Sequence, residues 1–396
     1  MDIVFQPSPA PTVGIEIELA LVDASTMALS SSVDDVMARV PPDLAWCIKP
    51  ELMQCYIEIC SGVASSIADA DKDLRAKVIA AEGIADELGL RLYWTGAHPF
   101  SRWHEQKVTR NERYEKLIER LQDMSRQLVT FGLHVHVGLD SGGKAIMICD
   151  RIMRHLPTLL ALSCNSPWWD ARVSGLKSHR SKIMEMLPTA GLPPALRNWS
   201  EFVWLMNHLI RTGFLQSVRD IWWDVRPHYN FGTIEVRVCD MPGNLDDVLA
   251  IAALIHCLVK ALSDEIDRGT YQHDHHPMVV RQNKWRAARY GLDAALVDSF
   301  TYELASARDE VRSLVERLRP VALELGAAPY LDRAAELASG PTWADRQLAL
   351  LEQTRDPAEV VRRMSAASRL SGEPSGSGIS GIPRHIDCKG PPGPQG

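Results

Sequence analysis

The sequence predicts an α+β protein built on a mostly antiparallel sheet, with helices on one face and polar side chains lining the other face as a cup. Two observations carry this prediction. Short segments of alternating apolar and polar residues recur along the chain, and segments with helical periodicity separate them. Helices between strands also permit a parallel sheet, but short strands with one polar face are typical of antiparallel sheets.

The predicted elements follow from these two periodicities. Strands are predicted over residues 13–22, 54–60, 91–96, 131–139 and 232–239. Helices are predicted over residues 65–88, 110–128, 144–163, 201–218, 245–266, 295–325 and 341–365. We expect residues 12–365 to form a single domain after an N-terminal extension, residues 1–11. Residues 371–396 are rich in Gly, Pro and Ser, which predicts a disordered tail.

The composition excludes several classes of protein. The 396 residues are 46% hydrophobic and 23% charged, which is ordinary for a globular protein, and the net charge of -7 argues against a nucleic-acid partner. The longest apolar run, "VLAIAALIHCLV", has 12 residues and is too short to span a membrane. The start of the chain lacks the pattern of a signal peptide, and the cysteines form no CxxC pair. We therefore expect a cytoplasmic protein with reduced thiols.

The segment "VGIEIELA", residues 13–20, places two carboxylates inside an apolar run. Side chains alternate between the two faces of a strand, so Glu16 and Glu18 share one face and Ile17 lies on the other. Such a strand can simply be half-buried, with its polar face in water. Two neighbouring carboxylates also repel each other unless a positive charge lies between them, so the pair also indicates a cation site.

Two further segments repeat this pattern. In "ELMQCYIEI", Glu58 alternates with apolar residues, and Glu51 needs a turn or bulge to face the same way. In "GLHVHVGL", His134 and His136 share one face of the predicted strand. The alternatives are an exposed edge strand for the first segment and hydrogen-bonded core histidines for the second. Two histidines on one face also suit a metal ligand or a phosphate contact.

A fourth segment, "GTIEVRVCD", places Glu235 and Arg237 on one face, and "DVRPHYNF" just before it supplies Arg226. A Glu–Arg pair alone can be a cross-strand salt bridge. Four segments each have one apolar face and one face that carries Glu, His or Arg side chains, and this shared pattern favours a common site. An acidic cup with a few arginines suits divalent cations that hold a polyphosphate, because carboxylates bind Mg²⁺ and arginine neutralises the remaining charge.

Two other motifs resemble binding sequences. "GLDSGGKA", residues 138–145, matches the phosphate-loop pattern GxxxxGK, but Ala145 stands where that loop needs Ser or Thr to hold Mg²⁺. We interpret it as a connecting turn. "QHDHH", residues 272–276, could bind a transition metal, but it adjoins Pro277 and we interpret it as a loop.

Taken together, the motifs resemble the carboxylate–amine ligase family, the bacterial group related to glutamate–cysteine ligase. Similar segments occur in the same order at residues 12–23, 51–59, 96–100, 131–139, 162–180, 224–240 and 283–294. The usual opening of the family has three consecutive glutamates followed by Phe. Here Ile17 replaces the middle glutamate and Leu19 the aromatic residue, while Glu16 and Glu18 are kept.

The resemblance implies a fold similar to the catalytic domain of glutamine synthetase, in which a curved, mostly antiparallel sheet forms a cup with helices on its outer side. It also implies ATP-dependent amide formation. ATP would phosphorylate a carboxylate, typically the γ-carboxylate of glutamate, and an amine would attack the acyl phosphate. The implied cofactors are ATP, as substrate, and two or more Mg²⁺ or Mn²⁺ ions. Such chemistry needs positioning, charge neutralisation and exclusion of water.

The resemblance also assigns roles to individual residues. The implied metal ligands are Glu16, Glu18, Glu51, Glu58, His134 and Glu235. Arg237 is expected to contact the transferring phosphoryl group, and His136 and Arg226 are expected to touch a nucleotide phosphate or the acyl group. We expect Arg172 or Arg180 to bind the substrate carboxylate, because arginine can donate two parallel hydrogen bonds to it.

Other functions stay open at this point. The same cup could serve a guanidino kinase or a ligase of other acids and amines. A degenerate homologue could act as a binding or regulatory protein, although retention of all six implied ligands argues against this. The tryptophan pairs 168–169 and 222–223 fit either a core or the apolar surface of a homo-oligomer.

Overall fold

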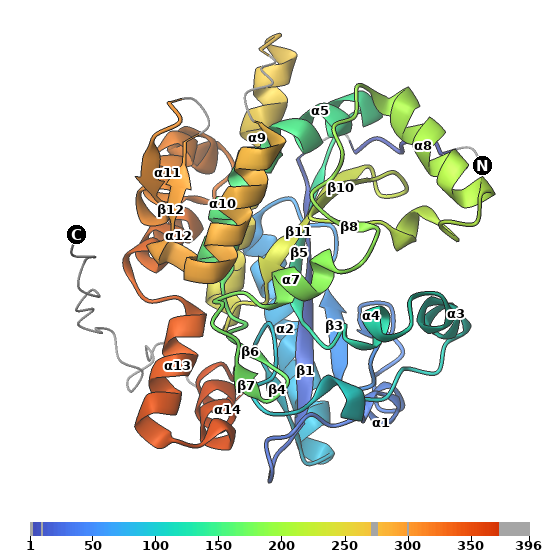
Figure 1. Cartoon of the computed structure of the whole chain (residues 1–396), viewed down its shortest axis with the longest axis vertical. Coiled ribbons are helices and arrows are strands. Elements are labelled where there is room, and N and C mark those ends of the chain that lie inside the picture. The colour runs from blue at the N-terminus through green and yellow to red at the C-terminus, as the bar shows by residue number, and fades with distance from the viewer. Residues whose placement is uncertain (1–2, 9–10, 271–275, 299–300, 372–396) are drawn as a thin grey trace, which may run out of the picture.

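The computed structural model describes residues 3–8, 11–270, 276–298 and 301–371 (Figure 1). Its centre is a seven-stranded sheet in the order β10-β11-β5-β1-β3-β2, with β4 paired to the end of β1. The strands are β1 Val13–Asp23, β2 Ile48–Pro50, β3 Tyr56–Cys60, β4 Leu90–Tyr93, β5 Gly132–Gly138, β10 Val225–His228 and β11 Thr233–Asp240. Every pairing within this sheet is antiparallel. The predicted α+β class and antiparallel sheet are confirmed.

β1 explains why the sheet has one apolar and one polar face. Ile15, Ile17 and Leu19 are no more than 1% exposed, whereas Glu16 and Glu18 between them are half-buried on the opposite face. The alternation predicted for this strand is therefore confirmed. It gives the sheet a core face and a face on which ionisable groups are positioned.

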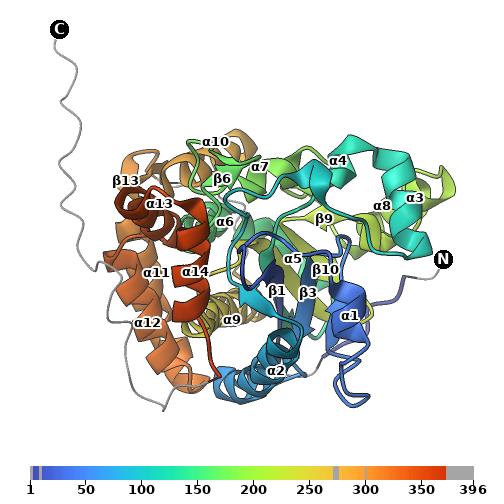
Figure 2. The ribbon, with the colours of Figure 1, turned by 90° about the horizontal axis from the view of Figure 1, so that it is seen from below.

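Helices cover the core face of the sheet. α9 (Leu245–Asp267) packs against β5, and α2 (Ile67–Glu87) packs against β1 and β3. α11 (Ala307–Glu324) and α12 (Ala328–Ser339) form a further layer outside α9, as Figure 2 shows from below. The longest apolar run lies in α9 and is buried. No helix in the described part of the chain is long and apolar enough to cross a membrane.

Some predicted helices are interrupted. The segment 110–128 forms α3 (Glu112–Leu121) and α4 (Asp123–Arg126), because Gln122 between them has a φ of 50°. The segment 201–218 forms α8 (Trp199–Arg211), which ends just before Gly213 with a φ of 74°. A positive φ is incompatible with continued right-handed helix. The prediction of one continuous helix in each segment is wrong.

The remaining helical predictions need similar corrections. The segment 144–163 is split by a 3-10 turn, the segment 341–365 is split at Arg355 with a φ of 57°, and 295–325 begins with a β-hairpin. The resulting elements are α5 Gly142–Ile152, α6 Leu156–Ser163, β12 Ala295–Val297, β13 Leu304–Ser306, α13 Trp343–Thr354 and α14 Pro357–Ala367. The sequence analysis missed α1 Val33–Met37, α7 Arg180–Glu185, α10 Pro277–Tyr290, α12 and the edge strands β2 and β10.

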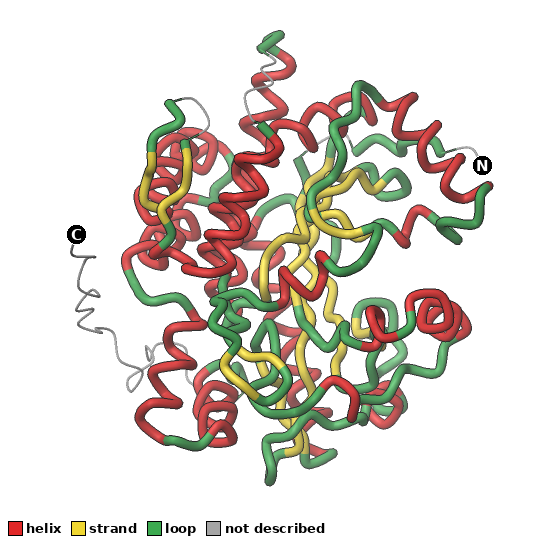
Figure 3. Tube along the Cα trace, viewed as in Figure 1, coloured by secondary structure: helices red, strands yellow, loops and turns green. Residues whose placement is uncertain are grey.

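Besides the β12–β13 hairpin, short strands outside the main sheet form two further pairs. β6 (Trp168–Trp169) pairs with β7 (Arg172–Val173), and β8 (Ala190–Gly191) runs parallel to β9 (Trp222–Trp223). Trp168 and Trp223 are buried, so each tryptophan pair contributes to the protein's own core. Figure 3 shows the strands as a central band with helices around it. An oligomer stays a prediction.

The N-terminal extension lies along the sheet. The Gln6 amide donates to the Tyr229 carbonyl at 2.8 Å, and the Ser8 amide donates to the Leu139 carbonyl at 2.7 Å. Ile3 and Phe5 are buried. The tail predicted over 371–396 lies outside the described residues apart from Ser371.

Candidate active site

Three cross-strand rows of side chains line the polar face of the sheet. The first row runs through Arg226, Glu235 and His136, the second through His134, Glu16 and Cys60, and the third through Glu18, Glu58 and Lys49. We use the word cup for these nine residues together with Glu51, Arg180 and Arg237. Residues directly opposite in antiparallel strands have adjacent side chains. The strand register therefore assembles the cup from segments that are far apart in the sequence.

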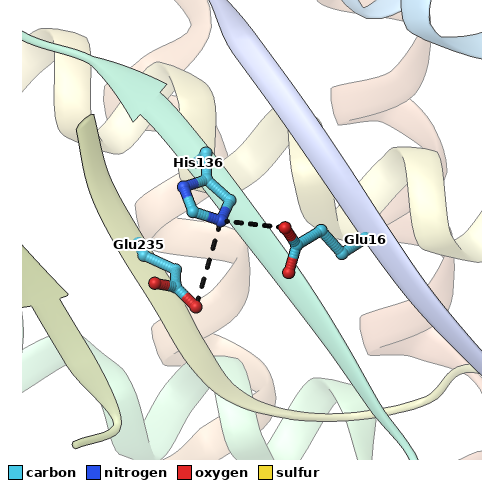
Figure 4. Close-up of side chains that lie close together, drawn as sticks. All are labelled: Glu16, His136 and Glu235. Atoms are coloured by element: carbon cyan, nitrogen blue, oxygen red, sulfur yellow. Dashed lines mark ion pairs between the residues drawn. The ribbon is translucent and has the colours of Figure 1, made fainter. Parts of the chain in front are cut away.

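Glu235 is the most buried carboxylate of the cup. It is 1% exposed, accepts a hydrogen bond from Arg226 Nε at 2.7 Å and pairs with Arg237 Nη1. Burial opposes its ionisation, but the two guanidinium groups outweigh burial and hold the pKa of Glu235 well below its ordinary value. Figure 4 shows His136 between two carboxylates, with Nε2 3.4 Å from Glu16 Oε1 and 3.9 Å from Glu235 Oε1.

The two histidines differ in charge. Burial and the nearby Arg237 lower the pKa of His134 to about 4, so its imidazole is neutral at neutral pH. Burial also opposes protonation of His136, but Glu235 and Glu16 outweigh it and raise its pKa. The Nε2 atom of both rings is buried; that of His136 contacts Glu16 and Glu235, whereas that of His134 has no hydrogen-bond partner. A buried, unpartnered imidazole nitrogen such as that of His134 suits a cation or a donor that binds there.

At the other end of the cup, three carboxylates repel one another. Burial and the mutual charge raise the pKa of Glu18 and of Glu51 to about 7 and that of Glu58 to about 8. Glu16 behaves differently, because His136 and His134 outweigh burial and lower its pKa well below the ordinary value. Charge repulsion among the carboxylates therefore raises the pKa of Glu18, Glu51 and Glu58 but does not raise that of Glu16.

Glu51 reaches the cup from the turn between β2 and β3, as its odd spacing required. Its carboxylate accepts hydrogen bonds from the Leu52 amide at 3.2 Å and from the Tyr114 hydroxyl of α3 at 3.4 Å. α3 therefore lies on the cup side of the sheet. Tyr114 was missed in the sequence analysis, because only the tertiary fold brings α3 to this turn.

The donor atoms of the cup form three overlapping groups that fit cations. Within each group the donor atoms lie within 4.8 Å of one another, and the groups are Glu16–His136–Glu235, Glu16–Glu58–Cys60 and Glu18–Glu58–His134. Glu16 and Glu58 each belong to two groups, so the carboxylates are spaced to be shared between neighbouring cations. Five of the six implied ligands take part, and Glu51 belongs to none of these groups. The ligand role of all six residues stays a prediction.

The Arg180 side chain is part of the cup, whereas Arg172 is not. The Arg180 side chain is buried, its two terminal nitrogens donate to the Arg237 carbonyl at 3.4 Å, and its Nε has no hydrogen-bond partner. A Cβ atom on Gly132 would lie 2.1 Å from Arg180 Nη2, so any side chain at this position would displace the Arg180 guanidinium. Arg172 is exposed on β7, and its role stays a prediction.

A buried aspartate holds the segment that carries Arg180. Asp240 at the end of β11 accepts hydrogen bonds from the Asn165 amide at 2.9 Å, the Ser166 hydroxyl at 2.6 Å and the Ser178 hydroxyl at 2.8 Å. Ser166 Oγ in turn accepts from the Arg180 amide at 3.0 Å. Arg180 is therefore positioned by β11 itself.

The phosphate-loop-like motif does not contribute to the cup. In "GLDSGGKA", Ser141 caps the N-terminus of α5, and Lys144 pairs with Asp140 at 2.6 Å and with Asp267 at 2.8 Å. The prediction of a connecting turn is confirmed. Residues 272–275 of "QHDHH" lie outside the described residues, and His276 caps α10 through its side chain.

Cys60 and Lys49 were also missed. Cys60 lies two residues after Glu58 on the same strand, so the period-two rule alone places its thiol in the cup. Lys49 lies opposite Glu58 on β2, with Nζ 3.5 Å from Glu58 Oε1. That edge strand is three residues long and gives no periodic signal.

Comparison with known proteins decides the family. The sequence profile of glutamate–cysteine ligase family 2 matches residues 12–364. The chain belongs to this family. It is 38% identical over 368 residues to "Putative glutamate–cysteine ligase 2" of Gloeobacter violaceus, covering 92% of this chain and 99% of that protein. It is 40% identical over 333 residues to the protein of the same name from Mycobacterium ulcerans, covering 84% of each. The chain is thus an ATP-dependent ligase that forms C–N bonds.

Solved structures of the family's fold agree with the architecture. A glutamate–cysteine ligase of Francisella tularensis in complex with AMP superimposes with a TM-score of 0.67 at 13% identity, covering 91% of this chain and 89% of that one. A bifunctional glutathione synthetase from Pasteurella multocida gives a TM-score of 0.64 at 15% identity, covering 91% of this chain and 52% of that one. At these identities the likeness concerns the fold.

Proposed function

We propose that this family member joins the γ-carboxylate of glutamate to an amine through an acyl phosphate, at the expense of ATP and with Mg²⁺ or Mn²⁺ in the cup. The observation that carries this proposal is the set of three overlapping donor groups, which share Glu16 and Glu58. One donor group is enough for a single cation. Phosphoryl transfer from a polyphosphate has a charged transition state, which neighbouring cations stabilise better than one cation does.

The basic residues of the cup suit the phosphoryl group. Arg237 and Arg226 flank Glu235 at one end of the rows, opposite to the acidic end formed by Glu18, Glu51 and Glu58. Arg237 Nε is buried without a hydrogen-bond partner, so it can donate to an anion without losing an existing hydrogen bond. When bound, Mg²⁺ would neutralise phosphate charge and polarise the terminal phosphoryl group, held by the carboxylates and by His134.

Arg180 is the residue best placed to bind the acid substrate. Its Nε is buried and unpartnered beside Arg237, and Asp240 and Ser166 fix its backbone. A guanidinium held in this way can orient the substrate carboxylate against the phosphoryl group. A carboxylate oxygen then bonds to the terminal phosphorus of ATP and ADP leaves. The amine nitrogen attacks the acyl carbon, phosphate leaves and the nitrogen loses a proton.

The decisive experiment follows the products. The protein is incubated with ATP, Mg²⁺, glutamate labelled with heavy oxygen in its γ-carboxylate, and a panel of amines that includes cysteine. We expect ADP, an amide detected by mass, and one heavy oxygen atom in the released phosphate. Amide without label in phosphate would overturn the acyl phosphate.

The same assay separates the alternatives. A guanidino kinase would convert a guanidino compound into a stable phosphorylated product and release no phosphate. A binding protein would consume no ATP with any pair of substrates. Titration calorimetry adds a test of the cations: we expect tight ATP binding with Mg²⁺ and none in EDTA, and equal affinity in both would refute the cation-filled cup.

A further inference from the structure

The thiol of Cys60 lies among the proposed cation ligands. In the register of β1 and β3, Cys60 is directly opposite Glu16. Its Sγ donates a hydrogen bond to Glu58 Oε1 at 3.1 Å. The thiol and the two carboxylates offer donor atoms that all lie within 4.8 Å of one another. This corner of the cup therefore presents one sulfur and two oxygen donors to a common point.

A second observation next to this corner indicates a cation. His134 is 3% exposed, and its Nε2 has no hydrogen-bond partner. A donor nitrogen of His134 lies within 4.8 Å of donor oxygens of Glu58 and Glu18, and Glu58 is shared with the group that contains Cys60. A buried imidazole thus adjoins the carboxylate that contacts the thiol. Sulfur is a ligand that Zn²⁺ prefers and Mg²⁺ does not.

A cationic side chain already contacts this corner. Lys49 Nζ lies 3.3 Å from Cys60 Sγ and 3.5 Å from Glu58 Oε1. The Lys49 side chain is 44% exposed, so its ammonium can move into water when another cation arrives. Its position shows that a positive charge is stabilised where the thiol and the Glu58 carboxylate meet.

We propose that Glu16, Glu58 and Cys60 form a site for a thiophilic divalent cation, with Zn²⁺ as the physiological representative. A cation bound at this site would exclude Mg²⁺ from the carboxylates of Glu16 and Glu58. On binding, the S–H bond of Cys60 breaks, its proton leaves to water, a sulfur–metal bond forms and Lys49 is displaced. The exclusion of Mg²⁺ rests on the proposed function, because it requires that Glu16 and Glu58 hold Mg²⁺. Binding of the thiophilic cation by Cys60 does not rest on the proposed function.

The site is tested with Co²⁺ as a spectroscopic probe on the full-length protein without nucleotide. We expect a thiolate-to-cobalt charge-transfer band in the near ultraviolet, which Zn²⁺ abolishes by displacing Co²⁺. Cys60→Ser should lose the band. Cys55→Ala is the matched control, because Cys55 is fully buried and outside all three donor groups, and it should keep the band. A band that persists in Cys60→Ser overturns the site.

Calorimetry then measures Zn²⁺ affinity directly. Cys60→Ser should weaken Zn²⁺ binding roughly tenfold or more, because it removes the sulfur ligand. Lys49→Ala should strengthen it, because the competing ammonium is gone. Unchanged Zn²⁺ affinity in both variants would overturn the site. If one variant folds poorly, the other still tests it.

Competition with Mg²⁺ separates this inference from the proposed function. Rising Mg²⁺ should weaken Zn²⁺ binding to the unmodified protein. Zn²⁺ binding that ignores Mg²⁺ overturns the exclusion, while the cobalt band decides the thiolate site separately. A protein that makes no amide but shows the Cys60-dependent band would refute the ligase proposal and support the zinc site.

Discussion

Glu16 and His134 face each other across β1 and β5, with Oε2 and Nδ1 3.3 Å apart. One row further along the sheet, Glu18 instead faces Glu58. The histidine neighbours keep Glu16 ionised, whereas the carboxylate pair is pushed toward protonation. The cup therefore has a charge gradient along β1, and the predictions below follow from it.

The acidic end should make the metal-free protein less stable as pH rises. Glu58 has a pKa of about 8 in the fold against an ordinary value of 4.5, so the folded state binds the extra proton between these values. Its contribution to stability is complete below about pH 4.5 and is lost as the pH rises through about 8. Melting temperature measured in EDTA should fall over this window, and Mg²⁺ should restore it.

A matched variant isolates this effect. Glu58→Gln keeps the shape of the side chain but cannot ionise, so its melting temperature in EDTA should depend less on pH than that of the unmodified protein and should not gain as much from Mg²⁺. A pH profile in EDTA identical to that of the unmodified protein would contradict the raised pKa of Glu58.

The two faces of β1 should respond in opposite ways. Glu16→Gln removes a charge from two donor groups and should lower kcat on the order of 100-fold or more. It should also lower the melting temperature slightly in EDTA, because the ionised form of Glu16 is favoured in the fold. Ligase assays and thermal unfolding measure both effects. Full activity of Glu16→Gln would contradict its place in the cup.

Ile17 provides the contrast on the core face. It is fully buried, so Ile17→Gln places an unsatisfied amide in the core and should cost about 1–4 kcal/mol of unfolding free energy. The kcat per folded molecule should change little. Urea unfolding and active-site titration test this. A stable but inactive Ile17→Gln would mean that the faces are assigned in reverse.

Arg180 should govern affinity for the acid substrate. Arg180→Lys keeps the charge but loses the paired donors, and we expect KM for the acid to rise about tenfold or more. Gly132→Ala should have the same effect, because the new Cβ would lie 2.1 Å from Arg180 Nη2. Gly143→Ala is the control, since its Cβ would meet no atom within 4 Å. Steady-state kinetics distinguish them, and a normal KM in Gly132→Ala would refute the positioning role.

Lys144 should be dispensable for catalysis. It pairs with Asp140 and Asp267, both of which are more than half exposed, so Lys144→Ala removes a salt bridge of modest strength. We expect turnover to change by less than about tenfold, since no phosphate contact is lost. A loss of a thousandfold would place the phosphate site at residues 138–145.

The sequence was most informative where a strand has one apolar face. β1, β5 and β11 could be predicted from alternation, and with them Glu16, His134 and Glu235, because a one-residue shift of register would move their apolar residues from the core to the cup face. Lys49 and Tyr114 could not, because a short edge strand and a neighbouring helix are placed by the whole fold. The helix breaks at Gln122 and Arg355 were hidden for another reason: both residues adopt a positive φ without the glycine that usually signals it.

The placement of β5 between β1 and β11 also determines at what stage of chain synthesis the complete cup can form. His134 and Glu16 are 118 positions apart, and Glu235 joins them only through β11, which ends at Asp240. A chain growing on the ribosome cannot form the first row of the cup until β11 has emerged and paired, because these contacts are all non-local. The Glu16–His136–Glu235 donor group is therefore the last to form, whereas the other two groups need only β1, β3 and β5. A cation bound to the finished cup would stabilise the completed protein by mass action.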